Sequence, residues 1–274
     1  MQKTTLIIVI LLFWATLSIT VAEAIEITPS DTKKIQEQIE IPSITRIEQY
    51  NQMYFLIGEP DTKIHLSVKW KLWHSGDLEE AHNIYFGYSQ QMMWELLRDD
   101  PYMRDVNYNP DFFYRYSRLN GNDFFDLGVF EHESNGRGGV NERSWNRTYL
   151  RYQSKYPVHL GDIRQDFSWS IKAWAPYAYN ISNTDIAQYR GYWEMELALY
   201  HINLLNGNQQ VIFRFYPGGG YNFRNGGQEL TLKTSLPRDW GVRFYLTAQV
   251  FHGYAETLLN YNEETWGGRF GFGF

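Results

Sequence analysis

Residues 189–200 read YRGYWEMELALY, and apolar and polar side chains alternate along this stretch. Its odd positions are apolar or glycine, at Gly191, Trp193, Met195, Leu197 and Leu199. Its even positions include charged residues, at Arg190, Glu194 and Glu196. Because successive side chains of a strand point to opposite faces, the stretch predicts a β-strand with one apolar face and one charged face.

The same alternation recurs along the chain from Gln52 onward. It predicts twelve strands, at residues 51–57, 64–73, 83–95, 109–118, 124–134, 144–154, 165–175, 189–201, 208–216, 227–235, 241–252 and 265–274. A β-sandwich whose apolar faces are turned inward also alternates. Periodicity alone therefore leaves a soluble secreted fold open.

Three features favour a membrane barrel over a sandwich. Many of the strands have ten or more residues, the length that a tilted membrane-spanning strand needs. Tryptophans lie at or near strand ends, where an interfacial aromatic girdle belongs, at Trp73, Trp94, Trp145, Trp240 and Trp266. The last strand ends on Phe274, and a terminal aromatic resembles the insertion signal of outer-membrane barrels. We predict an all-β fold, a twelve-stranded antiparallel transmembrane β-barrel over residues 49–274.

Composition agrees with this fold. Aromatic residues make up 18% of the 274 residues, although the mean hydropathy is negative. A barrel with an apolar lipid face and a polar lumen accounts for both values. The chain has no cysteine, so disulfides do not stabilise it, and its net charge of −6 argues against a nucleic-acid partner.

The first 24 residues have the pattern of a signal peptide. Lys3 supplies a positive charge, residues 6–15 are an apolar run, and residues 22–24 read AEA, a small-residue cleavage site. Residues 25–48 are polar, and we expect them to form a periplasmic segment with a short helix around residues 32–39. No second apolar run is long enough to cross a membrane as a helix.

An even number of strands places both ends of the barrel on the periplasmic side. Short periplasmic turns are then expected at residues 120–122 and 236–239. The longer external loops are expected at residues 95–108, 135–143, 177–188, 217–225 and 253–264. The loop that follows the strand 124–134 is therefore external.

The chemically suggestive stretch is HESNGR at residues 132–137, followed by SWNR at residues 144–147. His132 and Ser134 are two apart on a strand, so their side chains share a face. Extending that parity back places Phe124, Gly128 and Phe130 on the same outer face. The residues of opposite parity are charged, and we expect their side chains to meet in the lumen. They are Glu131, Glu133, Arg147 and Arg151.

Register brings a third polar residue to this face. If Ser134 pairs with Ser144 across the loop, His132 pairs with Asn146, with about 4.5–5.5 Å between their Cβ atoms. The Asn146 amide oxygen then accepts a hydrogen bond from one nitrogen of His132, and the other nitrogen faces Ser134. This is the nucleophile, base and orienting group of a catalytic triad. Most His and Ser residues spaced this way are ordinary surface residues, but unpaired polar groups facing lipid are costly.

The segment resembles the signature of the outer-membrane phospholipase A family, in which His-x-Ser-Asn-Gly precedes Ser-x-Ser-Trp-Asn-Arg. Here the second part reads ERSWNR at residues 142–147, with one substitution. The resemblance extends from Gln52 to the end of the chain. Further matching segments lie at residues 88–94, 99–101, 107–110, 191–192, 253–256 and 260–262.

This resemblance implies a homodimeric, calcium-dependent phospholipase A1 and A2 in the bacterial outer membrane, with lysophospholipid as a further substrate. It implies that His132, Ser134 and Asn146 are catalytic and that the Gly136 amide contributes to the oxyanion hole. Its active site would lie towards the outer leaflet.

The resemblance also implies a calcium site. The ligand positions correspond to Arg137, Glu142 and Asp99, the last from the partner subunit. The sequence departs from the family here, because Glu142 replaces a serine and Asp-Asp at 99–100 replaces a serine pair. Carboxylates are good calcium ligands, so we expect binding to persist with altered geometry. Gln90 corresponds to a glutamine that stabilises the dimer interface of the family.

Two other functions fit parts of the pattern. A small porin or passive transporter would use the charged residues to line a pore, at Glu131, Glu133, Arg147, Arg151, Glu194 and Arg214. It would conduct ions, whereas an enzyme scaffold would have its lumen filled by paired charges. A secreted β-sandwich esterase would instead be soluble without detergent.

Overall fold

The structure is a computed structural model that describes residues 47–160, 163–202, 208–220, 224–235 and 244–274. The expected signal peptide at residues 1–24, nearly all of the segment 25–48 and the turn at 236–239 lie outside the described residues. Within the described ranges, no helix has the length and apolar character needed to cross a membrane.

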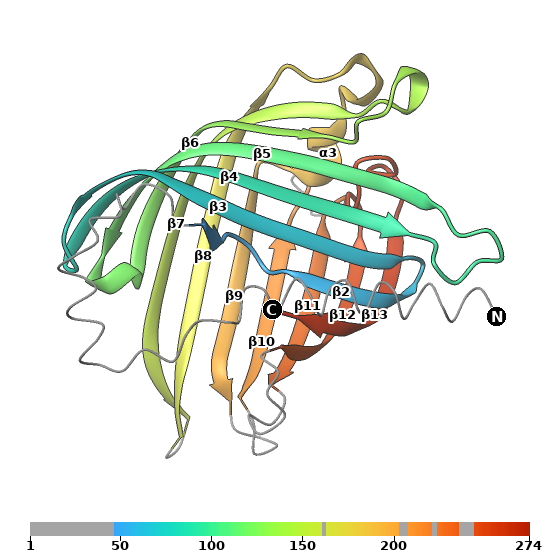
Figure 1. The fold of residues 1–274 in the computed structure, drawn as a ribbon. Helices are drawn as coiled ribbons and strands as arrows, with labels where there is room; N and C mark the ends of the chain where they lie inside the picture. The colour runs from blue at the N-terminus through green and yellow to red at the C-terminus, as the bar shows by residue number, and fades with distance from the viewer. Residues whose placement is uncertain (1–46, 161–162, 203–207, 221–223, 236–243) are drawn as a thin grey trace, which may run out of the picture. The chain divides into compact units, whose positions relative to one another are not determined.

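Strands β2–β13 form one closed antiparallel barrel (Figure 1). They span Tyr54–Glu59 (β2), Thr62–Gly76 (β3), Glu80–Trp94 (β4), Met103–Arg118 (β5), Asp123–Ser134 (β6), Ser144–Leu160 (β7), Ile163–Tyr177 (β8), Trp193–Ile202 (β9), Gln209–Tyr216 (β10), Gly227–Ser235 (β11), Tyr245–Gly253 (β12) and Thr265–Gly273 (β13). Each strand pairs with the next one, and β13 pairs with β2, which closes the sheet. The predicted twelve-stranded transmembrane barrel is confirmed.

A short strand, β1 (Ile47–Gln49), pairs with β3 just ahead of β2. The next residue, Tyr50, reaches into the lumen. Its hydroxyl donates to the Asp111 carboxylate at 2.6 Å, and its ring stacks on Phe113 with 5.2 Å between ring centroids. Tyr149 donates to the same carboxylate at 2.8 Å. The start of the described chain is thus tied to the inner wall of the barrel.

One predicted strand begins later than expected. Residues 186–190 form a short helix, α3 (Ile186–Arg190), and β9 starts only at Trp193. Gly191 ends the helix with a φ of 75°, and a Cβ there would lie 2.8 Å from the Gly218 carbonyl oxygen. Gly191 therefore makes a tight turn and is not the first apolar position of the strand.

A β-bulge in β6 overturns part of the predicted parity. Val129 is an extra residue, so the register of β6 shifts against both β5 and β7. Phe124 lines the lumen cavity and Gly128 is buried beneath the Tyr149 ring, whereas Phe130 is exposed. The predicted outer face is therefore wrong for Phe124 and Gly128 and right for Phe130. The bulge lies before His132 in the strand, and it reverses which of the alternating positions face the lumen and which face outward.

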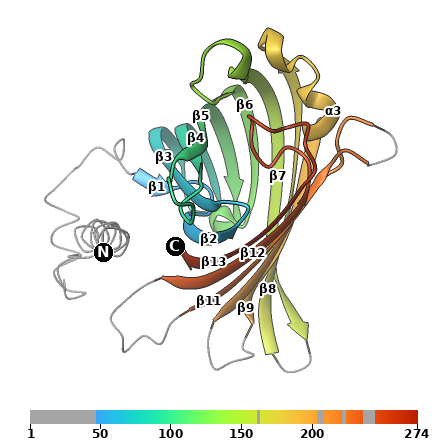
Figure 2. The same ribbon diagram turned by 90° about the vertical axis from the view of Figure 1, so that its right-hand side faces the viewer.

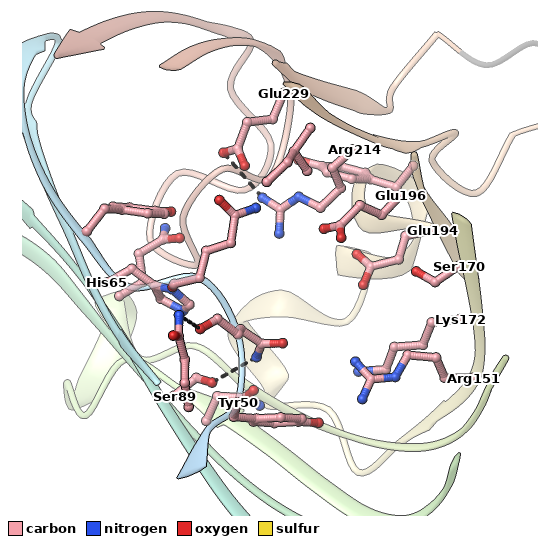
Figure 3. A pocket seen from close by; sticks show the side chains of 18 of the residues that line it. Tyr50, His65, Ser89, Arg151, Ser170, Lys172, Glu194, Glu196, Arg214 and Glu229 are labelled. Carbon is pink, nitrogen blue, oxygen red and sulfur yellow. Dashed lines mark hydrogen bonds and ion pairs between the residues drawn. The ribbon is translucent and has the colours of Figure 1, made fainter. Parts of the chain in front are cut away.

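Charged and polar side chains fill the lumen, as expected for a barrel in a membrane. Arg147 pairs with Glu131 and with Glu133, both at 3.0 Å. Lys63 pairs with Glu229 at 2.6 Å on the other side of the barrel. Figure 3 shows charged side chains converging on the remaining cavity of about 640 Å³, including Arg151, Lys172, Glu194, Glu196 and Arg214.

Apolar side chains project from the outer wall. Exposed examples are Leu127, Phe130, Leu150, Val250 and Phe270. On neighbouring positions of the same strands, charged residues such as Asp126 and Arg151 point inward and pair with each other. This inside-out distribution distinguishes the barrel from a soluble sandwich, whose apolar faces are buried between its sheets.

Candidate active site

Strands β6 and β7 place His132, Ser134 and Asn146 on one face. The register pairs His132 with Asn146 and Ser134 with Ser144, as the sequence predicted. Glu131, Glu133 and Arg147 line the lumen cavity. Because side chains alternate along a strand, their neighbours His132, Ser134 and Asn146 face the outside of the barrel.

His132 and Asn146 are joined by a hydrogen bond. Nδ1 of His132 lies 2.8 Å from Oδ1 of Asn146. The Asn146 amide group donates to the Ala178 carbonyl at 3.3 Å, which assigns Oδ1 as the acceptor for His132. In the neutral imidazole Nδ1 is then protonated and Nε2 is free to accept a proton.

Ser134 is the last residue of β6 and is half-buried. It shares the outer face with His132, two residues along the same strand. Its hydroxyl has no hydrogen-bond partner among the residues that the structure describes. The structure thus brings His132 and Asn146 into contact and places Ser134 beside them without a bond to the imidazole.

Asn135 organises the loop that follows Ser134. Its side-chain oxygen accepts from the Arg143 and Arg137 amides at 3.0 Å and 3.3 Å, and its amide group donates to the Asn141 carbonyl at 2.9 Å. The residue is buried, and its main-chain amide also donates to the Arg143 carbonyl. Sequence reasoning quoted Asn135 as part of the motif but gave it no role.

Gly136 follows directly and adopts a φ of 63°, in the left-handed region. A Cβ at this position would lie 2.9 Å from Cε2 of Tyr108. Both the conformation and the space require glycine here. Gly136, two residues after Ser134, thus has a backbone conformation that other residues rarely adopt.

A second loop, between β8 and β9, supports the start of β7. The buried Asn183 side chain contacts both the amide and the carbonyl of Ser144 at 3.1 Å, and the Asn180 amide donates to the same carbonyl at 2.9 Å. The two loops lie side by side at one end of the barrel (Figure 2). Sequence reasoning missed this support, for which the asparagines of residues 180–183 were the available signal.

A family model described as Phospholipase A1 matches residues 28–274. The chain belongs to the phospholipase A1 family. It is 30% identical to phospholipase A1 of Escherichia coli (strain K12) over 209 residues, which cover 74% of this chain and 65% of that relative. Phospholipase A1 of Salmonella typhimurium is 29% identical over 208 residues, with the same coverage. The match thus spans just under two thirds of these relatives.

Two solved structures share the fold of this phospholipase A1 family member. Outer membrane phospholipase A from Escherichia coli matches with a TM-score of 0.65 at 22% identity, over 83% of this chain and 93% of that one. The outer membrane phospholipase of Salmonella typhi, described as a dimer with bound calcium, matches with a TM-score of 0.63 at 22% identity, over 83% and 91%.

The positions suggested for a metal in this family member lie in two loops. Glu142 ends the short 3-10 helix at residues 139–141, and its carbonyl accepts from the Ser182 hydroxyl and from Arg143. Its half-buried carboxylate makes no hydrogen bond or ion pair with the described residues. Asp99 is exposed in the loop between β4 and β5. No cluster of three or more His, Asp or Glu side chains suited to a metal occurs in the described part of the chain.

Arg137 and Gln90 are held by local contacts. The Arg137 guanidinium donates to the Arg104 carbonyl and lies 4.0 Å from the Asp105 carboxylate. Gln90 on β4 accepts a hydrogen bond from the Tyr88 hydroxyl at 3.1 Å. Its neighbour Gln91 lines the lumen cavity, so Gln90 lies on the outer face of the barrel.

Proposed function

We propose that this family member hydrolyses acyl esters of glycerophospholipids by a serine mechanism in the outer membrane. Ser134 is the nucleophile, His132 the general base and Asn146 the orienting group. The observation that carries the proposal is the 2.8 Å contact between His132 and Asn146 on the outer wall, where lipid is the neighbouring solvent. The relatives named Phospholipase A1 support the same substrate class.

The geometry supports a two-step reaction. His132 Nε2 takes the proton of Ser134 as Oγ attacks the ester carbonyl, and the imidazolium then protonates the departing alcohol oxygen of the lysophospholipid. A water molecule that gives its proton to the same nitrogen attacks the acyl-enzyme and releases the fatty acid and free Ser134. Asn146 stabilises the imidazolium through Nδ1, and the Gly136 amide donates to the negatively charged oxygen.

Calcium fits the loop beside this site. The free, half-buried carboxylate of Glu142 is a hard oxygen donor of the kind that calcium prefers. The Arg137 and Asp99 positions would add oxygen ligands, with Asp99 supplied by a second subunit. When bound, the ion supplies positive charge near the developing oxyanion and polarises water there.

The active form in this proposal is a homodimer. The Salmonella typhi protein is described as a dimer with bound calcium. Gln90 lies on the outer face, where a second barrel can pack, and two barrels together enclose clefts for acyl chains. The loop 135–143 connects the same ends of the strands as the other long loops, which supports an active site towards the outer leaflet. Residues 1–24 would be removed as a signal peptide, leaving the segment that begins at residue 25 and precedes β1 in the periplasm.

The porin alternative is weaker because the lumen charges are paired with one another. Glu131 lies between Arg147 and Lys172, with contacts of 3.0 Å and 2.8 Å. Such a network narrows the lumen and ties β6, β7 and β8 together behind the site. A porin would show stepwise ion conductance in a planar lipid bilayer, which we do not expect here.

The test is release of fatty acid from phosphatidylcholine in detergent micelles. Folded Ser134→Ala protein is expected to lose calcium-stimulated hydrolysis, and a chelator is expected to abolish it in the unmodified protein. Ser170→Ala, in the lumen cavity, is the matched control and should retain full activity. Calcium-stimulated hydrolysis that persists unchanged in Ser134→Ala would refute the nucleophile.

A further inference from the structure

The hydrogen-bond ladder between β5 and β6 is interrupted opposite the general base. It pairs Tyr108 with Ser134 and Asp111 with Glu131, and no ladder pair is present between these two. The register on both sides of the interruption places Pro110 opposite His132. Proline has no N–H, so it cannot donate to the carbonyl that faces it.

The residue before the proline supplies the missing donor. Asn109 Nδ2 donates to the His132 carbonyl oxygen at 2.7 Å. Asn109 lines the lumen cavity, so this bond reaches the back of the wall whose front carries the imidazole. A side-chain amide thereby replaces a backbone amide within the sheet, where every backbone polar group needs a partner.

His132 is therefore held from two sides. Asn146 on β7 fixes its ring at Nδ1, and Asn109 on β5 fixes its main chain at the carbonyl. Regular pairing resumes at Ser134, two residues further along. A movement of the His132 peptide towards or away from β5 would change the distance between Nε2 and the Ser134 hydroxyl without disturbing Ser134 itself.

We propose that Asn109 is a positioning residue that compensates for Pro110 and holds His132 at the distance from Ser134 that proton transfer requires. This inference rests on the proposed function, because it assigns His132 the role of base. It concerns a residue that contacts neither the lipid nor the reacting atoms.

The test first removes the side-chain amide of Asn109 and then introduces a backbone N–H at position 110. Asn109→Leu, close in size but without a donor, is expected to lower kcat per folded molecule about tenfold to a hundredfold, the effect of a small misplacement of a catalytic group. KM should stay unchanged, since lipid binds on the opposite face. Adding Pro110→Ala supplies an N–H opposite His132, so the double variant should recover kcat to within about threefold of the unmodified enzyme.

Controls separate positioning from general loss of stability. Asn51→Leu also removes a lumen amide, one that donates to Ser89 Oγ at 3.1 Å, and should leave kcat unchanged. The folded fraction of each variant is measured by urea unfolding. If Asn109→Leu does not fold, Asn109→Ala takes its place with the same rescue expected.

Two results would overturn the proposal: an unchanged kcat in folded Asn109→Leu, or a double variant as slow as the single one. Loss of activity in Ser134→Ala together with either result would reject the positioning role alone. Full activity in Ser134→Ala would instead reject the proposed function.

Discussion

Nδ1 of His132 lies 2.8 Å from Oδ1 of Asn146, across the strand pair β6–β7. Asn146 is itself held by the Ala178 carbonyl in the loop between β8 and β9. The orientation of the imidazole is thus set by two neighbouring strands and a loop distant in sequence. In the proposed mechanism, the ring of His132 is therefore oriented before substrate arrives, which would lower the barrier to proton transfer.

Replacing Asn146 with alanine should slow the reaction without unfolding the barrel. The variant loses one hydrogen bond to the imidazole, worth roughly 1 kcal/mol or somewhat more for the charged ring, so we expect kcat to fall about tenfold. The measurement is steady-state hydrolysis of phosphatidylcholine. Thr148→Ala, on the same face of β7, is the control and should keep its kcat. Equal kcat values for both variants would contradict the orienting role.

Gly136→Ala should impair the reaction because the position requires a left-handed backbone and its Cβ would meet the Tyr108 ring. The conformational cost is about 1–2 kcal/mol, and the displaced amide would no longer meet the oxyanion. We expect kcat to fall about a hundredfold.

Gly138→Ala is the matched control for Gly136→Ala. It lies in the same loop with a φ of −113°, and nothing lies within 4 Å of its Cβ. Its activity should be normal. A Gly136→Ala enzyme as active as Gly138→Ala would exclude a role for this amide in catalysis.

Glu142→Gln should weaken calcium binding. The change removes a carboxylate charge, and calcium affinity follows the charge of its ligands, so we expect the calcium concentration for half-maximal activity to rise on the order of tenfold. Activity titrations with calcium test this. Glu263→Gln removes an exposed carboxylate from the loop between β12 and β13 and serves as the control. Identical titrations for the two variants would show that Glu142 does not bind the ion.

Glu256, in the loop between β12 and β13, should make stability depend on pH. Burial alone would raise the pKa of its carboxyl, but Lys63 and Arg269 beside it outweigh burial and lower this pKa below its ordinary value. The carboxylate therefore stabilises the fold fully above the ordinary pKa of a glutamate, and this contribution is lost as the pH falls through the lowered pKa.

Glu256→Gln is accordingly expected to lower the free energy of unfolding at pH 7 by about 3 kcal/mol, since it removes the carboxylate that pairs with buried Arg269 and one of the two that pair with buried Lys63. The difference from the unmodified protein should shrink as the pH falls below about 4. Urea unfolding at several pH values measures this difference. A difference that is constant with pH would contradict the assigned ion pairs.

The strands were predictable because alternation between lipid and lumen leaves a period of two in the sequence. Each predicted strand overlaps one of β2–β13, and the pairing of His132 with Asn146 followed from parity and register alone. The bulge at Val129 was not predictable from the sequence. An extra apolar residue among apolar neighbours does not mark the position at which the inward and outward alternation reverses. For the same reason Phe124 and Gly128 were assigned to the wrong face.

The supporting asparagines show where sequence reasoning ends. Asn135 was visible in the motif, yet its bonds to three loop residues depend on how the loop returns to β7. Asn109 was likewise visible beside Pro110, but its contact with His132 depends on which strand lies opposite. Short polar side chains are compatible with turns, surfaces and buried networks, so their sequence alone does not choose among these.

By itself, the sequence determined the barrel, its strand count and the face shared by His132 and Ser134. The strand count and the shared face follow from local periodicity, which a membrane imposes on every spanning strand. The choice of a barrel over a sandwich rested on strand length, on tryptophans near strand ends and on the terminal Phe274. Only the tertiary structure decided the inner and outer sides of β6 before the bulge, the late start of β9 after α3, and the contacts that hold the imidazole. Those depend on register between strands and on loops that meet in space, and such long-range contacts leave no period along the chain.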